Sequence, residues 1–158
     1  MSGFALVKRV LGVDHGQARI GLAISDELGM LAHPLETVSA KPADAALRRI
    51  AQLAREKDVD AVVLGLPKHM SGAAGTAAAE VEAFAAKLRP LLSCKLVLWD
   101  ERLTTTAAHR ALRDAGRKTK STRGVVDQVA AQMILQGYLD SRAGAGAGTM
   151  PDPDAALE

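Results

Sequence analysis

Acidic residues directly follow two apolar segments of the sequence, at points where a β-strand would end. Asp14 closes the segment VLGVD, and Asp100 and Glu101 follow LVLW. Burying an ionised carboxylate is costly unless a cation or hydrogen-bond donors compensate its charge. An aspartate in a turn, or an ion pair with Arg102, would account for these acids without function. Because neighbouring strand residues point to opposite faces, at most one of Asp100 and Glu101 faces a given site, and the pattern does not decide which.

A third acid, Asp127, stands near the start of the last helix that we expect. At helical spacing it shares a face with Ala130, Ala131 and Ile134, which read as a core-facing stripe. The helix dipole favours an acid in a first turn, which explains the position of Asp127 along the helix. It does not explain why that acid lies on an apolar face, so we favour a functional role.

Carboxylates from two strand ends and one helix start could converge on one rim of a sheet. Hard cations such as Mg²⁺ and Mn²⁺ take oxygen ligands of this kind. Two such ions about 3.5–4 Å apart can activate water and stabilise the leaving oxygen in phosphodiester hydrolysis. The acids therefore indicate metal-dependent phosphodiester cleavage, while their convergence is a hypothesis that spacing cannot test.

Two further segments could contact phosphates. Residues 65–72 (GLPKHMSG) form a shaped loop after an apolar strand, although they lack the GxxxxGK[ST] pattern and an ordinary connection explains them equally well. Upstream of Asp127 lies a cluster of basic residues, which a solvated loop would also explain: Arg113, Arg117, Lys118, Lys120 and Arg123. The four histidines share no metal-ligand spacing, so we assign none of them to a metal.

The elements that must position these residues follow from hydrophobic periodicity. Strands are predicted at residues 8–14, 19–25, 31–38, 61–66 and 95–100, and helices at 42–57, 75–88, 104–115 and 125–139. A β-meander followed by βαβ crossovers predicts an α/β fold with a five-stranded mixed sheet and helices on both faces. We expect one domain over residues 1–140 and a flexible tail over residues 141–158, because that tail is rich in Gly, Ala and Pro.

Composition limits the class of protein. A chain of 158 residues, 48% of them apolar, is long enough to bury a single core. The lone Cys94 excludes an intrachain disulfide, and a net charge of +2 neither requires nor excludes a nucleic-acid partner. The N-terminus lacks the features of a signal peptide, and no apolar run approaches ~20 residues. We therefore expect a soluble cytoplasmic protein with no membrane partner.

Taken together, four segments resemble the YqgF (RuvX) family of pre-16S rRNA nucleases, also described as Holliday-junction resolvases. The segments are LGVDHGQARIGLAISD, VVLGLPKHMSGAAG, LWDERLTTTAA and VVDQVAAQMILQGYL, which span about residues 10–139. The sequence departs from the family pattern in the second segment, where Lys68, His69 and Ser71 replace Leu, Asn and Asp. It also departs at Gln128, where a small residue is usual.

The resemblance implies an RNase H-like (RuvC-like) fold and Mg²⁺- or Mn²⁺-dependent cleavage. It assigns the three catalytic, metal-binding acids to Asp14, Glu101 and Asp127, with Asp100 as the reserve for Glu101. We expect the substrate backbone to be held by Arg19, Lys68, His69, Arg102, Arg117, Lys118, Lys120 and Arg123.

The family role is maturation of the 5′ end of 16S rRNA, so structured RNA is the first expected partner, with ribosomal proteins as further candidates. A Holliday-junction resolvase acting on branched DNA is the first alternative, and it would favour a homodimer over a monomer. The second alternative is a non-catalytic RNA-binding factor in ribosome assembly. An ATPase of the actin or Hsp70 kind needs two such domains, which this chain is too short to supply.

Overall fold

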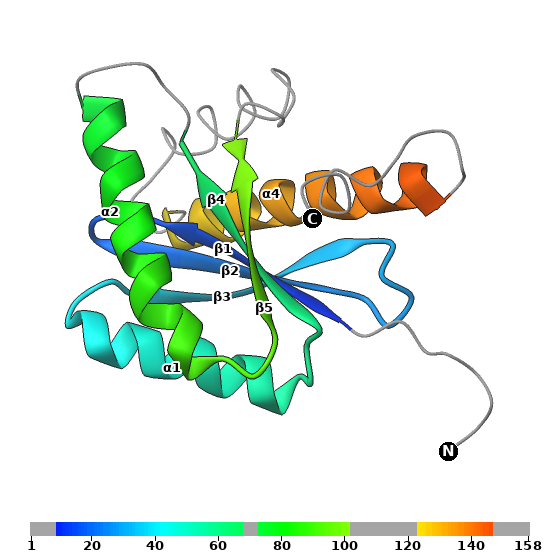
Figure 1. Cartoon of the computed structure of the whole chain (residues 1–158), viewed down its shortest axis with the longest axis horizontal. Coiled ribbons are helices and arrows are strands. Elements are labelled where there is room, and N and C mark those ends of the chain that lie inside the picture. Colours follow the sequence, from blue (N-terminus) through cyan, green and yellow to red (C-terminus); the bar gives the residue numbers. More distant parts are fainter. Residues whose placement is uncertain (1–8, 68–72, 102–122, 147–158) are drawn as a thin grey trace.

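A computed structural model describes residues 9–67, 73–101 and 123–146 of the chain. Its strands form a five-stranded sheet in the order β3-β2-β1-β4-β5 (Figure 1). The strands are β1 (Val10–His15), β2 (Arg19–Ser25), β3 (Ala32–Ser39), β4 (Ala61–Leu66) and β5 (Lys95–Asp100). Neighbours are antiparallel from β3 to β1 and parallel from β1 to β5, which confirms the predicted mixed sheet.

Helices pack on both faces of this sheet, as expected. One face carries α1 (Ala43–Glu56) and α2 (Ala73–Leu88), the latter followed by the short 3₁₀ helix η1 (Arg89–Leu91). The long helix α4 (Arg123–Gly146) crosses the other face (Figure 1). The helix predicted at residues 104–115 lies outside the described part of the chain. Within that part, no helix is long and apolar enough to cross a membrane.

Helix α4 is longer than the sequence predicted. It ends at Gly146 rather than at residue 139, so residues 141–146, which we assigned to a flexible tail, are helical. Alanine is the best helix former and offsets the unfavourable glycines of this stretch. In addition, the Arg142 guanidinium donates to the Tyr138 hydroxyl at 3.0 Å and lies over its ring. These local contacts extend the helix beyond the end of its apolar stripe.

Alternation along β1 separates two hydrophobic cores. Leu11 and Val13 belong to the core that is shared with α1 and α2, whereas Val10 belongs to the core under α4. Gly12 lets α4 approach closely, since a Cβ there would lie 2.8 Å from the Cβ of Leu135. By the same alternation, Asp14 faces α4.

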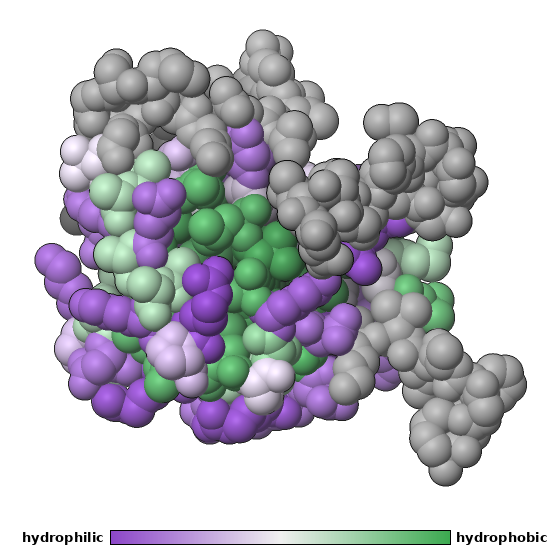
Figure 2. All heavy atoms as spheres, in the orientation of Figure 1, coloured by the Kyte–Doolittle hydropathy of each residue, from purple (hydrophilic) through white to green (hydrophobic). Residues whose placement is uncertain are grey.

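The outer edge of the sheet is partly apolar. Figure 2 shows hydrophobic atoms gathered around β5 near the centre of this view, above the hydrophilic outer surface of α1. Leu98 of β5 keeps 38% of its surface exposed. The face beneath α4 lies behind the sheet in this orientation, and it is there that the acidic residues meet.

Candidate active site

Asp14 lies between two glycines of the neighbouring strands. Gly21 of β2 is its register partner, and the parallel register that pairs Val13 with Leu64 brings Gly65 of β4 to its other side. Because neither glycine has a side chain, space is left on the α4 face on both sides of the Asp14 carboxylate. The other two predicted acids occupy that space.

Asp127 packs directly onto Gly21. A Cβ added at Gly21 would lie 3.0 Å from the Cβ of Asp127 and would collide with the Asp127 carbonyl oxygen. The first turns of α4 therefore contact the sheet at the residue paired with Asp14, and this contact places Asp127 beside Asp14.

Glu101 lies over the second glycine. A Cβ at Gly65 would lie 3.3 Å from the Cγ of Glu101 and 2.5 Å from the Cδ1 of Ile134. Alternation along β5 agrees, since Trp99 packs against the core under α4 and Glu101 shares its side. Asp100 falls on the other side. The geometry thus brings Glu101, rather than Asp100, to Asp14, a choice that sequence alone left open.

Glu101 and Asp127 both disfavour the charged form of Asp14. The pKa of Asp14 is raised from 3.8 to about 7, chiefly because burial disfavours its charged form, and further by the negative charges of Glu101 and Asp127. A perturbed carboxyl in a cluster of like charges is typical of functional sites, where a bound cation relieves the repulsion.

Arg19 of β2 supplies a positive charge at the border of the cluster. Its Nε lies 2.6 Å from Oδ2 of Asp127, and the two side chains are 41% and 20% exposed. The sequence predicted Arg19 as a substrate contact, and the structure shows in addition that it is an ion-pair partner of one of the acids.

The oxygen-rich donor set of two aspartates and one glutamate suits a hard divalent cation. Within residues 9–67, 73–101 and 123–146, no three His, Cys, Asp or Glu side chains are close enough together to form a ready-made metal site. The acids are therefore near enough to shift a pKa, but they are not arranged as a coordination shell.

Comparison with known proteins assigns the chain to a family. The family described as "RuvX: Holliday junction resolvase" matches residues 8–141. The chain belongs to the RuvX family. A relative from Halalkalibacterium halodurans named "Putative pre-16S rRNA nuclease" is 48% identical over 134 residues, which are 84% of this chain and 96% of that protein. A relative of the same name from Geobacillus kaustophilus is 47% identical over 136 residues, covering 85% and 99%.

Solved structures confirm the RuvC-like fold of this RuvX-family chain. Thermus thermophilus RuvC in complex with a Holliday junction superposes with a TM-score of 0.56 at 17% identity, covering 86% of this chain and 96% of that one. The fowlpox virus Holliday junction resolvase gives 0.50 at 16% identity, covering 84% and 99%. The family and the relatives' names agree on a nuclease, which is a hydrolase of phosphodiester bonds.

Most of the predicted substrate contacts of the RuvX-family chain fall outside the described residues. Arg123 opens α4, but its side chain is not among those described. Beyond the described ranges lie Lys68, His69, Arg102, Arg117, Lys118 and Lys120.

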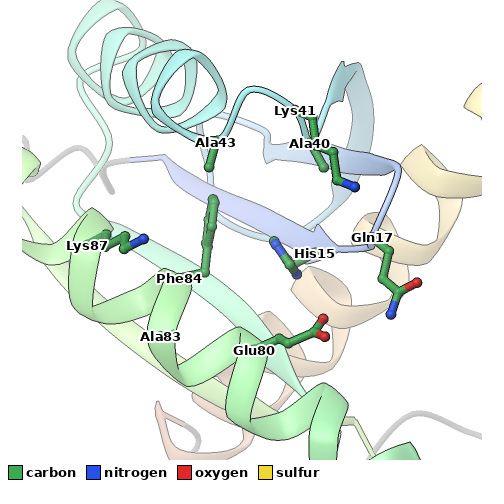
Figure 3. Close-up of a pocket in the computed structure, with 9 residues that line it drawn as sticks. All are labelled: His15, Gln17, Ala40, Lys41, Ala43, Glu80, Ala83, Phe84 and Lys87. Carbon is green, nitrogen blue, oxygen red and sulfur yellow. The ribbon is translucent and has the colours of Figure 1, made fainter.

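The sequence did not predict a pocket on the face of the sheet opposite the acidic residues. A pocket of about 550 Å³ opens between the end of β1, the start of α1 and the side of α2 that carries Phe84 (Figure 3). Its lining includes His15, whose pKa is lowered by burial although Glu80 opposes the shift. Alternation does put His15 opposite Asp14, but the pocket itself arises only where α1 and α2 meet the sheet.

Proposed function

We propose that this RuvX-family chain is a metal-dependent endonuclease that acts on structured RNA in the cytoplasm, in the 5′-end maturation of pre-16S rRNA. The observation that carries the proposal is that Glu101 and Asp127 crowd a largely buried Asp14, whose pKa is raised to about 7, first by burial and further by those two charges. A protein gains nothing in stability from such a cluster, whereas a nuclease uses it to bind cations. The RNA substrate is inferred from the names of relatives at 47–48% identity.

Asp14, Glu101 and Asp127 would hold Mg²⁺ or Mn²⁺. Such an ion, when bound, activates water for attack on phosphorus and offsets charge on the leaving oxygen. The carboxylates must be ionised to act as ligands, and a nearby cation favours the ionised form of Asp14. Arg19 pairs with Asp127 through its Nε, and its partial exposure supports a further contact with a backbone phosphate at the rim of the site.

The test is cleavage by purified protein of two substrates side by side, an RNA carrying the 16S 5′ leader and a four-way DNA junction, with Mg²⁺ or Mn²⁺. Asp14→Asn is the matched control, because it removes one charge and leaves the shape of the side chain almost unchanged. Cutting of the RNA alone, lost in Asp14→Asn, supports the proposal. Equal cutting by wild type and Asp14→Asn would contradict the assigned site.

Junction resolution is the second candidate, and the family description together with the fold of RuvC favours it. A resolvase cuts two opposed strands, so it needs two copies of the site related by symmetry. Symmetrical junction cutting by a species that light scattering shows to be a dimer would establish this candidate. Tight RNA binding without cleavage under any metal condition would instead indicate a non-catalytic assembly factor.

A further inference from the structure

The pocket at the end of β1 has the size and lining of a small-molecule site. Its volume of about 550 Å³ lies within the roughly 300–1,000 Å³ typical of such sites. Its floor is apolar, formed by the buried side chains of Phe84 and Ala40. Lys41, Lys87, Gln17 and Glu80 stand around this floor, and the His15 ring lies beside Phe84 (Figure 3).

One flat ring in the pocket is held in a fixed position. The His15 ring packs on Phe84 with centroids 4.5 Å apart and an interplanar angle of 43°. Phe84 is buried in the core beneath α2, whereas His15 is only half-buried. Phe84 thus fixes the orientation of a partly exposed imidazole, and histidine rings are among the surfaces on which unpaired RNA bases stack.

The exposed side chains around the ring complement a nucleotide. Lys87 of α2 lies on one side of Phe84 and Lys41, before α1, lies across the hollow (Figure 3), so that two ammonium groups can meet phosphates. Gln17 and Glu80 lie near His15. Amide and carboxylate groups are suited to hydrogen bonding with base edges.

A single tight turn separates this pocket from the acidic cluster. Asp14 and His15 are consecutive and point to opposite faces of β1, and Gln17 in the following turn lines the pocket. Arg19, just after the turn, faces the acids through Asp127. The turn is closed by the Gly16 N–H, which donates to the Arg19 carbonyl oxygen at 3.0 Å, and a Cβ at Gly16 would collide with that oxygen.

We infer that this pocket is a nucleotide subsite: it takes an unpaired nucleotide of the RNA substrate close to the bond that is cut, with the base on His15 and the phosphates between Lys41 and Lys87. The inference rests on the proposed function, because it assumes an RNA strand at the acidic cluster. It adds that the strand crosses the turn at residues 16–18 and that single-stranded RNA at the cut is preferred to a continuous duplex.

The test uses the 5′ leader RNA with 2-aminopurine placed at successive positions around the cut, bound to the full chain in EDTA so that no cleavage occurs. Stacking quenches 2-aminopurine, so we expect quenching at one or two adjacent positions and its loss in His15→Leu. Lys87→Gln should weaken binding roughly three- to ten-fold, the range expected when one phosphate contact of about 1 kcal/mol is lost. The matched control Lys95→Gln, an exposed lysine at the opposite end of the sheet, should leave binding unchanged.

Even quenching along the RNA, or equal loss of affinity in Lys87→Gln and Lys95→Gln, would overturn the inference. AMP alone binding as tightly as the RNA would also overturn it, because the pocket would then serve a free nucleotide. If His15→Leu lowers the melting temperature, Gln17→Ala on the exposed turn replaces it as the variant at this end of the pocket. If the protein cleaves the RNA but quenching is not specific to a position, the nucleotide subsite is contradicted and the proposed nuclease function is not. If quenching is specific to a position but no cleavage occurs, only the nuclease function is contradicted.

Discussion

Asp127 lies directly on Gly21, with its backbone where a β-carbon of residue 21 would have to be. Gly21 is also the register partner of Asp14, so one close contact between α4 and the sheet sets the separation of two acids that are far apart in sequence. The site therefore depends on the absence of a side chain as much as on the presence of its carboxylates.

Gly21→Ala should damage both the fold and the site. The added methyl group collides with the backbone of α4, so we expect a loss of about 3 kcal/mol, the upper end of the usual cost of overpacking. Chemical denaturation measures this loss. Gly137→Ala in α4 is the control, since its Cβ would lie 3.3 Å from Nε1 of Trp99, where a small shift of the ring relieves the contact, and should change stability by less than about 1 kcal/mol. Similar stabilities of the two variants would contradict the close packing at Gly21.

Asp14→Asn should stabilise the metal-free protein at alkaline pH. The pKa of Asp14 is about 7 in the folded protein, above its ordinary value of 3.8. The contribution of the neutral carboxyl to the free energy of unfolding is therefore full below pH 4 and is lost as the pH rises to 7. At pH 8 the ionised carboxylate costs on the order of 4 kcal/mol, which Asn avoids. Melting temperatures in EDTA should thus match near pH 4 and diverge toward pH 8. Equal melting at pH 8 would mean that Asp14 ionises freely.

Glu101→Gln and Asp100→Asn should differ sharply. Glu101 lies beside Gly65 on the α4 face, whereas Asp100 falls on the other side of β5. We expect Glu101→Gln to reduce cleavage by roughly a hundred-fold or more, as for other groups that stabilise transition-state charge, and Asp100→Asn to change it by less than about three-fold. The measurement is the initial rate of RNA cleavage by each variant at saturating Mg²⁺. The reverse order would reinstate Asp100 as the acid of the site.

Arg19→Gln should bind divalent cations more tightly and RNA more weakly. The guanidinium competes with a cation for Asp127, and a partly exposed pair of this kind is worth about 0.5–1 kcal/mol, so Mn²⁺ affinity should rise roughly two- to five-fold. Calorimetric titration with Mn²⁺ measures this change. Arg48→Gln, which breaks the exposed pair with Asp44 on α1, serves as the control. Weaker Mn²⁺ binding in Arg19→Gln would show that Arg19 supports the metal site instead of competing with it.

Much of the fold could be predicted because its pattern is local. The apolar runs of β1 and β4 and the stripe containing Leu47 and Ile50 in α1 fixed the type of these elements, and their bounds agree with the structure to within two residues. The end of α4 could not be predicted in this way, because residues 141–146 carry no apolar stripe, and the helix continues there with alanines and the contact of Arg142 with Tyr138.

The sequence by itself determined the five strands and the three longer helices of the described residues, which face of each is apolar, and that acids stand where strands end and where the last helix begins. Only the tertiary structure decided that Glu101 rather than Asp100 joins Asp14, that Arg19 pairs with Asp127 from 108 residues away, and that His15 opens into a pocket. The physical reason is that alternation and helical period act over a few residues. The separation of distant side chains depends on sheet register and on how closely a helix can approach a glycine.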